Sequence, residues 1–258
     1  MSSSPKILIL RLSSLGDILH ALPAFADLRS SLPDAKIDWL VGKKARFLLS
    51  AVRGIDEIFV LDTDALVRFP FDRSAWKAFR DLLRNLRSRR YDCSLDFQGL
   101  LKTALLAFVS GSRARLGFSK GLVREYPAHW FYDQALEKPE RQVHVLTLNR
   151  MLAGLAGARP ASASLDFIVR DEDSRYVDSA LERERLRDFI VINPGGGWPT
   201  KRWPAARYGA LAARIQAELG LRVAVTTGPG EEDLYRRMAD PSSRSFPCHL
   251  PVSFLQLI

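Results

Sequence analysis

Residues 6–31, KILILRLSSLGDILHALPAFADLRSS, decide the fold class of this 258-residue chain. The run Lys6–Leu12 is short and apolar, as a buried strand is, and the polar turn Ser13–Asp17 leads into a predicted helix over Ile18–Ser31. Arg11 interrupts the apolar run too early for a signal peptide. A buried strand followed at once by a helix is the opening of an α/β fold with a parallel sheet.

The alternation of strands and helices continues along the chain and restarts once. Strands are predicted at 36–41, 57–61, 91–97 and 115–117, and helices at 74–90, 100–109 and 142–154. Ser74 is predicted to be the N-cap of the helix 74–90. The small, polar segment Gly154–Ser164 is predicted to link two domains, 1–160 and 161–258. Beyond it, strands at 165–169, 189–193, 222–227 and 249–252 alternate with helices at 171–185, 205–219 and 231–238. Two alternations predict an α/β protein with two doubly wound domains, the second incomplete.

Composition and charge narrow the class of protein. Hydrophobic residues make up 47% and charged residues 26%, as in ordinary soluble domains, and no apolar run is long enough for a transmembrane segment. Two cysteines cannot form a disulfide framework, so we expect a cytoplasmic protein. Residues 1–160 hold 25 basic and 16 acidic side chains, whereas residues 161–258 hold 13 of each. This asymmetry indicates either an anionic partner for the first domain or an ordinary, solvated basic surface.

Motifs that would identify several common enzyme classes are missing from the sequence. It contains no GxGxxG and no GxxxxGK[ST], which disfavours dinucleotide binding and a P-loop. It contains no CxxC or HExxH, and its four histidines are scattered, so a zinc site is not expected.

Asp17 is the first candidate site residue. It follows Gly16 in the turn after the first predicted strand, and ligands of open α/β sheets bind at the carboxyl ends of strands. The alternative is that Asp17 only caps the following helix.

Two turns in the second half form a candidate phosphate site. Asn193–Pro204, NPGGGWPTKRWP, places three glycines, Lys201 and Arg202 between a predicted strand and a helix. Glycines let backbone N–H groups approach an anion, and a lysine adds a point charge. Thr226–Asp233, TTGPGEED, joins the next strand to its helix, and its carboxylates either cap that helix or bind a ribose or base. The alternative for the first turn is a glycine-rich loop with two exposed basic residues.

A third turn, Asp96–Lys102, also joins a predicted strand to a helix. Gln98 and Lys102 are expected to face one crevice, unless this is a plain βα turn. Arg124 precedes the aromatic stretch Trp130–Tyr132, and such aromatic residues more often belong to a core.

Taken together, these motifs resemble the bacterial heptosyltransferases, glycosyltransferase family 9, which add heptose from a nucleotide-activated donor to the inner core of lipopolysaccharide. The resemblance rests on ILRLSSLGDILHALPAFADLR (9–29), DFQGLLKTALLA (96–107), NPGGGWPTKRWP (193–204) and TTGPGEED (226–233). These stretches have the family's order and spacing, and the resemblance extends over essentially the whole chain. The segment Gly117–Tyr132 looks closest to the type that adds the first heptose to a Kdo sugar.

The resemblance implies two Rossmann-like domains in the GT-B arrangement and inverting transfer without a metal or another cofactor. It implies ADP-heptose as donor substrate and an anionic lipid A–Kdo acceptor at the inner face of the membrane, with no nucleic acid partner. The enzyme is then expected to be cytoplasmic, with peripheral association at the inner membrane. Asp17 matches the family's general base, and Lys201 matches the lysine that stabilises the departing diphosphate. Donor contacts are expected from Gly196, Gly197, Lys201 and Glu231 or Glu232, and acceptor contacts from Ser14, Gly16, Gln98, Lys102 and Arg124.

The family pattern continues past Ile258 with an Asp-Thr-Gly turn and a nearby histidine that hold the nucleotide diphosphate. We therefore expect these 258 residues to bind ADP weakly and to transfer little heptose. The alternative function is that of a non-catalytic, truncated relative that holds an anionic glycan or a nucleotide. A third hypothesis, a basic nucleic-acid-binding protein, agrees with the net charge of +9 but has no helix-turn-helix or RNP-like motif to support it.

Overall fold

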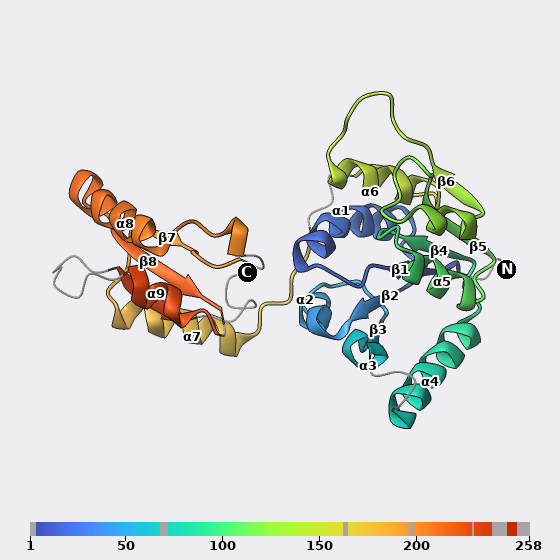
Figure 1. Cartoon of the computed structure of the whole chain (residues 1–258), viewed down its shortest axis with the longest axis horizontal. Coiled ribbons are helices and arrows are strands. Elements are labelled where there is room, and N and C mark those ends of the chain that lie inside the picture. The colour runs from blue at the N-terminus through green and yellow to red at the C-terminus, as the bar shows by residue number, and fades with distance from the viewer. Residues whose placement is uncertain are drawn as a thin grey trace. The chain divides into compact units, whose positions relative to one another are not determined.

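The computed structural model describes residues 4–67, 72–161, 165–196, 199–228, 230–238 and 247–251. Contacts within the chain divide it into two compact units, 1–168 and 169–258. Figure 1 shows that each unit combines a sheet with helices packed on it. Both sheets are parallel, which confirms the predicted α/β class.

The first unit holds six parallel strands in the order β3-β2-β1-β4-β5-β6. The strands are β1 (Lys6–Leu10), β2 (Lys36–Gly42), β3 (Glu57–Leu61), β4 (Cys93–Asp96), β5 (Ala114–Phe118) and β6 (Gln134–Leu136). The helices are α1 (Leu15–Ser31), α2 (Arg46–Ser50), α3 (Thr63–Val67), α4 (Arg73–Arg89), α5 (Leu101–Val109) and α6 (Val145–Gly154), with 3₁₀ turns η1 (Lys43–Ala45) and η2 (Tyr126–Phe131). The strand order reverses between β1 and β4, which is the point where doubly wound sheets bind ligands.

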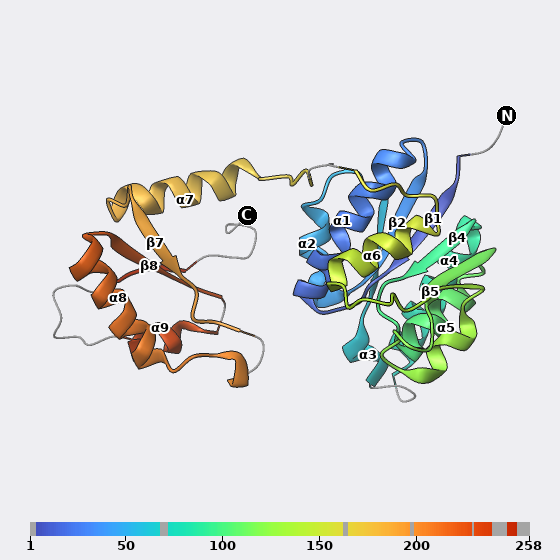
Figure 2. The same cartoon turned by 90° about the horizontal axis from the view of Figure 1, so that it is seen from above.

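Helices cover both faces of this sheet, so its central strands are buried on both sides. Figure 2 shows α1 and α6 side by side over one face, where Phe25 of α1 packs against Trp39 of β2. On the other face, Leu8, Leu10 and Leu40 pack with side chains of α4 and α5. Burial on both sides explains why β1 is a continuous apolar run rather than an alternating one.

The residue that caps the start of α4 is not the predicted one. One carboxylate oxygen of Asp72 accepts the backbone N–H groups of Ser74 (2.9 Å) and Ala75 (3.2 Å). Asp72 is therefore the N-cap, and the prediction of Ser74 was wrong, because Ser74 already lies inside the first turn.

In the second unit, the described residues form three parallel strands in the order β7-β8-β9. The strands are β7 (Phe189–Ile192), β8 (Arg222–Thr227) and β9 (Cys248–Pro251), and the helices are α7 (Asp171–Arg183), α8 (Ala205–Leu219) and α9 (Glu232–Met238), with the 3₁₀ turn η3 (Pro199–Lys201). Ala180 of α7 packs with Ala224 and Leu250 on one face, and Ala212 of α8 packs with Val223 and Val225 on the other.

The boundary between the units lies later than the predicted linker. Asp27 of α1 is 2% exposed, and its carboxylate accepts bonds from the Arg150 guanidinium (2.6 Å) and from the Ala161 N–H (2.9 Å). These bonds attach the predicted linker to the first unit. The predicted strand 165–169 was wrong, because Phe167 forms only an isolated antiparallel bridge with Val52, also in the first unit.

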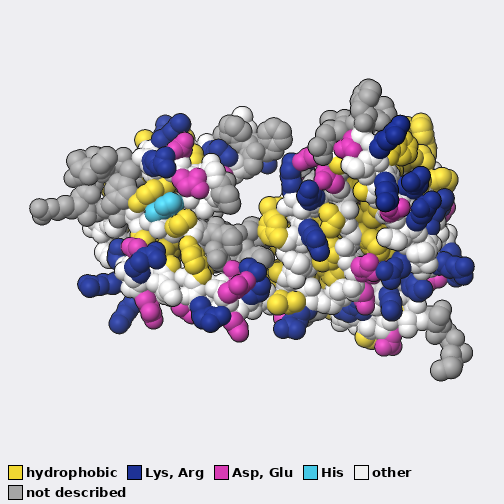
Figure 3. Space-filling model, turned by 90° about the horizontal axis from the view of Figure 1, so that it is seen from below, with side chains coloured by type: hydrophobic (Ala, Val, Ile, Leu, Met, Phe, Trp, Pro, Cys, Tyr) yellow, Lys and Arg dark blue, Asp and Glu magenta, His cyan; other side chains and the backbone are white. Residues whose placement is uncertain are grey.

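The described part of the chain contains no helix that is long and apolar enough to cross a membrane. On the face shown in Figure 3, Lys and Arg side chains are interspersed with Asp and Glu rather than gathered into one block.

Gly117 of β5 is expected to tolerate no side chain. A Cβ placed there would overlap the ring of Tyr132, whose hydroxyl donates to the buried Asp96 carboxylate (2.7 Å). Gly117→Ala should lower the free energy of unfolding by about 1–3 kcal/mol, as overpacking of a core does. Chemical denaturation monitored by circular dichroism measures this loss.

Gly154→Ala is the matched control, because no atom lies within 4 Å of a Cβ at this helical position. Its unfolding free energy should equal or slightly exceed that of the wild type, since alanine favours helix. If both variants unfold at the wild-type denaturant concentration, the Tyr132 ring does not exclude a side chain at position 117.

Candidate functional site

Asp17 lies in the first turn of α1, directly beyond the carboxyl end of β1. Its carboxylate accepts the backbone N–H and the hydroxyl of Ser14, both at 3.2 Å, so the two residues form a capping box. Asp17 therefore caps α1, and this capping leaves its Oδ1 free for other contacts. Gly16, between them, is exposed, with no atom within 4 Å of the place where a Cβ would stand.

Two arginines form ion pairs with the same carboxylate. Arg11 Nη2 lies 2.9 Å from Asp17 Oδ2, and Arg124 Nη2 lies 3.3 Å from Asp17 Oδ1. Burial raises the pKa of Asp17, but Arg11, the Ser14 N–H and Arg124 outweigh it and hold that pKa below its usual value. Asp17 is thus ionised at neutral pH, the form that can accept a proton.

Arg11 is a part of the site that was not predicted from the sequence. It is 2% exposed, and its Nη1 donates to the Phe97 carbonyl, which follows β4. Its Nε, also buried, has no hydrogen-bond partner. A cation buried between β1 and β4 holds the Asp17 carboxylate at the reversal point of the sheet, and an arginine inside an apolar strand run was the available signal.

Arg124 is placed by the turn after β4. Its backbone N–H and that of Glu125 both donate to the Gly99 carbonyl (3.0 and 3.1 Å), and Gly99 has a φ of 66°, which favours glycine. The Glu125 carboxylate accepts the Leu101 N–H at 2.7 Å, at the start of α5. Arg124 and Asp17, 107 residues apart in sequence, are thereby brought together.

Gln98 and Lys102 do not share a crevice as predicted. Gln98 is 3% exposed, and its side-chain oxygen accepts the Leu12 N–H at 2.7 Å, which fixes the exit of β1. Lys102 is exposed on α5. The turn directs the two side chains differently because Gln98 is in the loop and Lys102 is on the outer side of the helix.

Asp96 is a second buried group beside this edge whose role was not predicted from the sequence. It is fully buried at the end of β4, and it accepts the Gln98 N–H (2.8 Å) and the Tyr132 hydroxyl (2.7 Å). Burial raises the pKa of Asp96, although these hydrogen bonds oppose the rise. Asp96 therefore holds the turn and Tyr132 in place.

The glycine-rich turn of the second unit is built around Glu231. One oxygen of its carboxylate accepts the Gly196 N–H (3.3 Å) and lies 3.4 Å from Arg202 Nη2, and the other accepts the Gly228 N–H (3.2 Å). A Cβ at Gly195 would overlap this carboxylate, so any side chain there would displace Glu231 from the turn. The predicted phosphate turn and the predicted acidic turn thus lie side by side at the carboxyl ends of β7 and β8.

The two basic residues of this turn differ in their partners. Arg202 Nε donates to the Gly196 carbonyl at 2.7 Å, so Arg202 is used in holding the loop. Lys201 is exposed, and the described residues offer it no ion pair. Glu232 is also exposed and reaches only the Gly230 N–H, at 3.4 Å. Gly197 lies outside the described residues.

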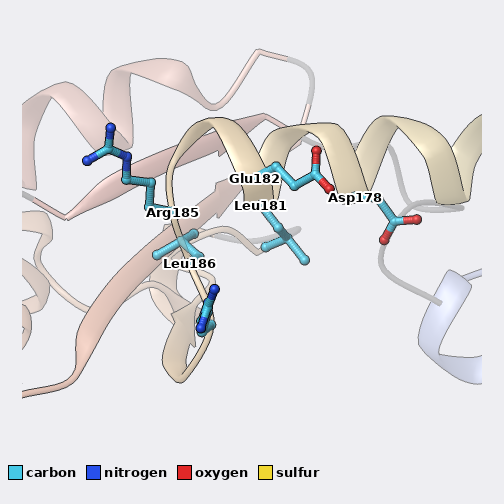
Figure 4. A pocket seen from close by; sticks show the side chains of 6 residues that line it. Asp178, Leu181, Glu182, Arg185 and Leu186 are labelled. Carbon is cyan, nitrogen blue, oxygen red and sulfur yellow. The ribbon is translucent and has the colours of Figure 1, made fainter.

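A cavity of about 600 Å³ lies at the end of α7. Figure 4 shows the carboxylates of Asp178 and Glu182 along the helix and Arg185 beyond its last turn. None of its lining residues belongs to the Asp17 or Glu231 groups, so it adds nothing to the candidate site. The described ranges contain no cluster of three or more His, Cys, Asp or Glu side chains arranged to hold a metal ion.

Solved structures share this fold. The structure of E. coli heptosyltransferase WaaC with ADP-2-deoxy-2-fluoro heptose superimposes with a TM-score of 0.77 at 22% identity, covering 98% of this chain and 78% of that one. The chain thus shares the α/β fold of this heptosyltransferase structure, as the resemblance led us to expect.

Two relatives of this chain share one protein name. Lipopolysaccharide heptosyltransferase 1 of Pseudomonas aeruginosa is 28% identical over 88% of this chain and 62% of its own length. The protein of the same name from Campylobacter coli is 33% identical over 83% of this chain and 61% of its own. The chain therefore spans less than two thirds of the length of these relatives.

The family comparison covers both units and agrees with the motifs. The model of glycosyltransferase family 9 (heptosyltransferase) matches residues 79–250, a range that includes the Asp96 turn and the whole glycine-rich turn. On this match the resemblance inferred from the motifs is confirmed: the chain belongs to glycosyltransferase family 9, the heptosyltransferases.

Proposed function

We propose that this protein is an inverting glycosyltransferase that transfers heptose from ADP-heptose to the Kdo/heptose inner core of lipopolysaccharide. The observation that carries the proposal is the Asp17 carboxylate held between the guanidinium groups of Arg11 and Arg124 at the reversal point of the first sheet. The names of the relatives and the ADP-heptose analogue in the solved WaaC structure support the choice of sugar and acceptor.

Asp17 acts as the general base. Its carboxylate accepts the proton of an acceptor hydroxyl while that oxygen forms a bond to the anomeric carbon of the heptose. The bond from that carbon to the diphosphate breaks on the opposite face, and ADP leaves with the electron pair. The products are the inverted glycoside, ADP and a proton on Asp17, and base assistance of this kind contributes about 10²–10⁴-fold in rate.

The donor lies on the second unit in this proposal. Lys201 and the N–H groups of Gly196 and Gly197 stabilise the charge of the leaving diphosphate, and the Gly196 N–H exchanges its bond to Glu231 for one to a phosphate oxygen. We infer that Glu231, rather than Glu232, meets the nucleoside, because its carboxylate points between the two turns while that of Glu232 is exposed. These groups provide the charge stabilisation without a metal ion or another cofactor.

The acceptor is an anionic lipid A–Kdo molecule at the inner face of the membrane, which makes the enzyme cytoplasmic and peripherally associated. Arg124, 52% exposed beside Asp17, would contact the acceptor's acidic groups, with Ser14, Gly16 and Lys102 as further acceptor contacts. Gln98 is not among them, because its side chain is buried and its oxygen accepts the Leu12 N–H. No nucleic acid partner is proposed.

The direct test is transfer itself. Protein expressed from its complete reading frame is incubated with ADP-heptose and Kdo-terminated lipid A, and mass spectrometry should detect the acceptor enlarged by one heptose, with an equal yield in the presence of EDTA. Residues 1–258 alone should transfer little heptose under the same conditions. Loss of transfer in EDTA would contradict the metal-free mechanism. ADP binding without any transfer would instead favour the non-catalytic binding protein.

The pH dependence of transfer should report on Arg11. Because Arg11 lowers the pKa of Asp17, removing its charge raises that pKa, and Asp17 then becomes protonated at a higher pH. Arg11→Met should therefore move the acid limb of the kcat/KM profile to higher pH by at least about one pH unit. Arg11→Lys keeps the charge and should move it much less. Equal profiles for all three proteins would show that Arg11 does not control Asp17.

A further inference from the structure

Aromatic and aliphatic side chains of η2 and α5 form an exposed patch on the first unit. In η2, Trp130 is 68% exposed and Tyr126 58%; on α5, Phe108 is 51% exposed and Leu105 39%. The two elements pack together, and the Phe131 ring meets Phe108 with 5.9 Å between centroids. We call Leu105, Phe108, Tyr126 and Trp130 the aromatic patch. Exposed apolar groups gathered in this way mark an interaction site.

The rings of η2 contact one another rather than the core. Tyr126 lies 4.7 Å from His129 and 5.9 Å from Trp130, measured between ring centroids, while the buried Ala128 anchors the turn. By contrast, the Trp39 side chain in the same unit is fully buried in the core, whereas Trp130 is held at the surface by its position in η2. Tyrosine and tryptophan held this way present an apolar ring and one polar edge, the combination favoured where lipid meets water.

The charge around the aromatic patch is positive. Lys102 is exposed on α5 three residues before Leu105 and six before Phe108, so the three side chains share one helix face. Arg124 is 52% exposed just before η2. The acidic groups beside it are engaged within the protein, since Glu125 accepts the Leu101 N–H and Asp133 pairs with Arg115. Basic groups around aromatic ones are typical of surfaces that bind anionic lipid.

The aromatic patch is continuous with the candidate base. η2 begins immediately after Arg124 and Glu125, and Arg124 pairs with Asp17 at 3.3 Å. We propose that the aromatic patch docks the first unit on an anionic lipid surface, with Trp130 and Tyr126 entering the headgroup layer. The inference rests on the proposed function only in that docking would bring the first unit to a lipid-borne acceptor. Binding of the patch to lipid does not depend on heptose transfer.

Vesicle binding tests the inference without any assay of transfer. Flotation of the protein with vesicles of phosphatidylethanolamine and phosphatidylglycerol should show binding that vesicles of phosphatidylcholine alone do not give. Trp130→Ala and Tyr126→Ala should each reduce binding by about tenfold or more, since each removes a large apolar ring from the contact. Trp76→Ala is the matched control, because Trp76 is 46% exposed but lies on α4, and it should bind as the wild type does.

A second measurement locates the contact. Brominated lipid should quench tryptophan fluorescence in the wild type, and Trp130→Phe should remove most of that quenching while keeping most of the binding. Equal binding to both kinds of vesicle, or wild-type binding by Trp130→Ala, would overturn the inference. Self-association that Trp130→Ala abolishes would also overturn it and assign the patch to a second copy of the chain. Vesicle binding by a protein that transfers no heptose would leave the patch standing and remove the proposed function.

Discussion

Asp17→Asn is expected to reduce heptose transfer by about 10²–10⁴-fold and to leave ADP affinity unchanged. The amide keeps the shape of the carboxylate and can still accept the Ser14 N–H, so the start of α1 is retained. It cannot take the acceptor's proton. Initial rates of ADP release measure turnover, and calorimetric titration with ADP measures binding to the second unit.

This substitution also removes the counter-charge of the buried Arg11, so its effect on folding has to be separated from its effect on catalysis. Asp62→Asn is the matched control: like Asp17, Asp62 caps a helix start, accepting the backbone N–H groups of Asp64 and Ala65, and pairs with a cation, Lys43, but it lies outside the site. It should transfer heptose at the wild-type rate. If Asp17→Asn is folded and retains more than about a tenth of wild-type turnover, Asp17 is not the base.

Lys201→Ala is expected to weaken ADP binding by about 10- to 150-fold, the equivalent of about 1.5–3 kcal/mol for a charge-assisted contact to phosphate. Because Lys201 is exposed and has no ion pair among the described residues, its loss should leave the thermal stability unchanged. Isothermal titration with ADP and thermal unfolding of the same samples measure the two quantities.

Arg202→Ala provides the contrast within the same turn. Arg202 bonds the Gly196 carbonyl and pairs with Glu231, so its loss should lower the unfolding temperature and weaken ADP binding less than Lys201→Ala does. Lys201→Arg keeps the charge and should recover part of the affinity. Equal losses of ADP affinity in the two alanine variants would mean that the wrong basic residue has been assigned to the diphosphate.

Most of the fold follows from local sequence patterns. The strands β3 and β8 and the helix α8 have the predicted bounds, because each is an uninterrupted run with one clear periodicity. The short elements α2, α3, η2 and β6 span only three to six residues and give no periodic signal. They are fixed by the chain's path between longer elements, which no local pattern contains.

Part of the candidate site could likewise be predicted from the sequence, and part could not. Asp17 and the glycine-rich turn were predictable, since strand-to-helix turns with acidic or glycine residues mark the ligand edge of a parallel sheet. Arg11 was not, because its significance depends on a carbonyl 86 residues away. Gln98 was wrongly assigned to a crevice, because no local pattern shows that its oxygen accepts the Leu12 N–H.

The bonds of Asp27 set where the first unit can be cut as an autonomous fold. A fragment that stops at Gly154, where the composition changes, would lose the Ala161 N–H and leave a buried carboxylate with one of its partners missing. It would also lose the Asp166 carbonyl that accepts the Arg53 N–H. Cooperative unfolding of the first unit therefore has to include the segment up to Ile168, and an isolated first unit should be cut at that residue.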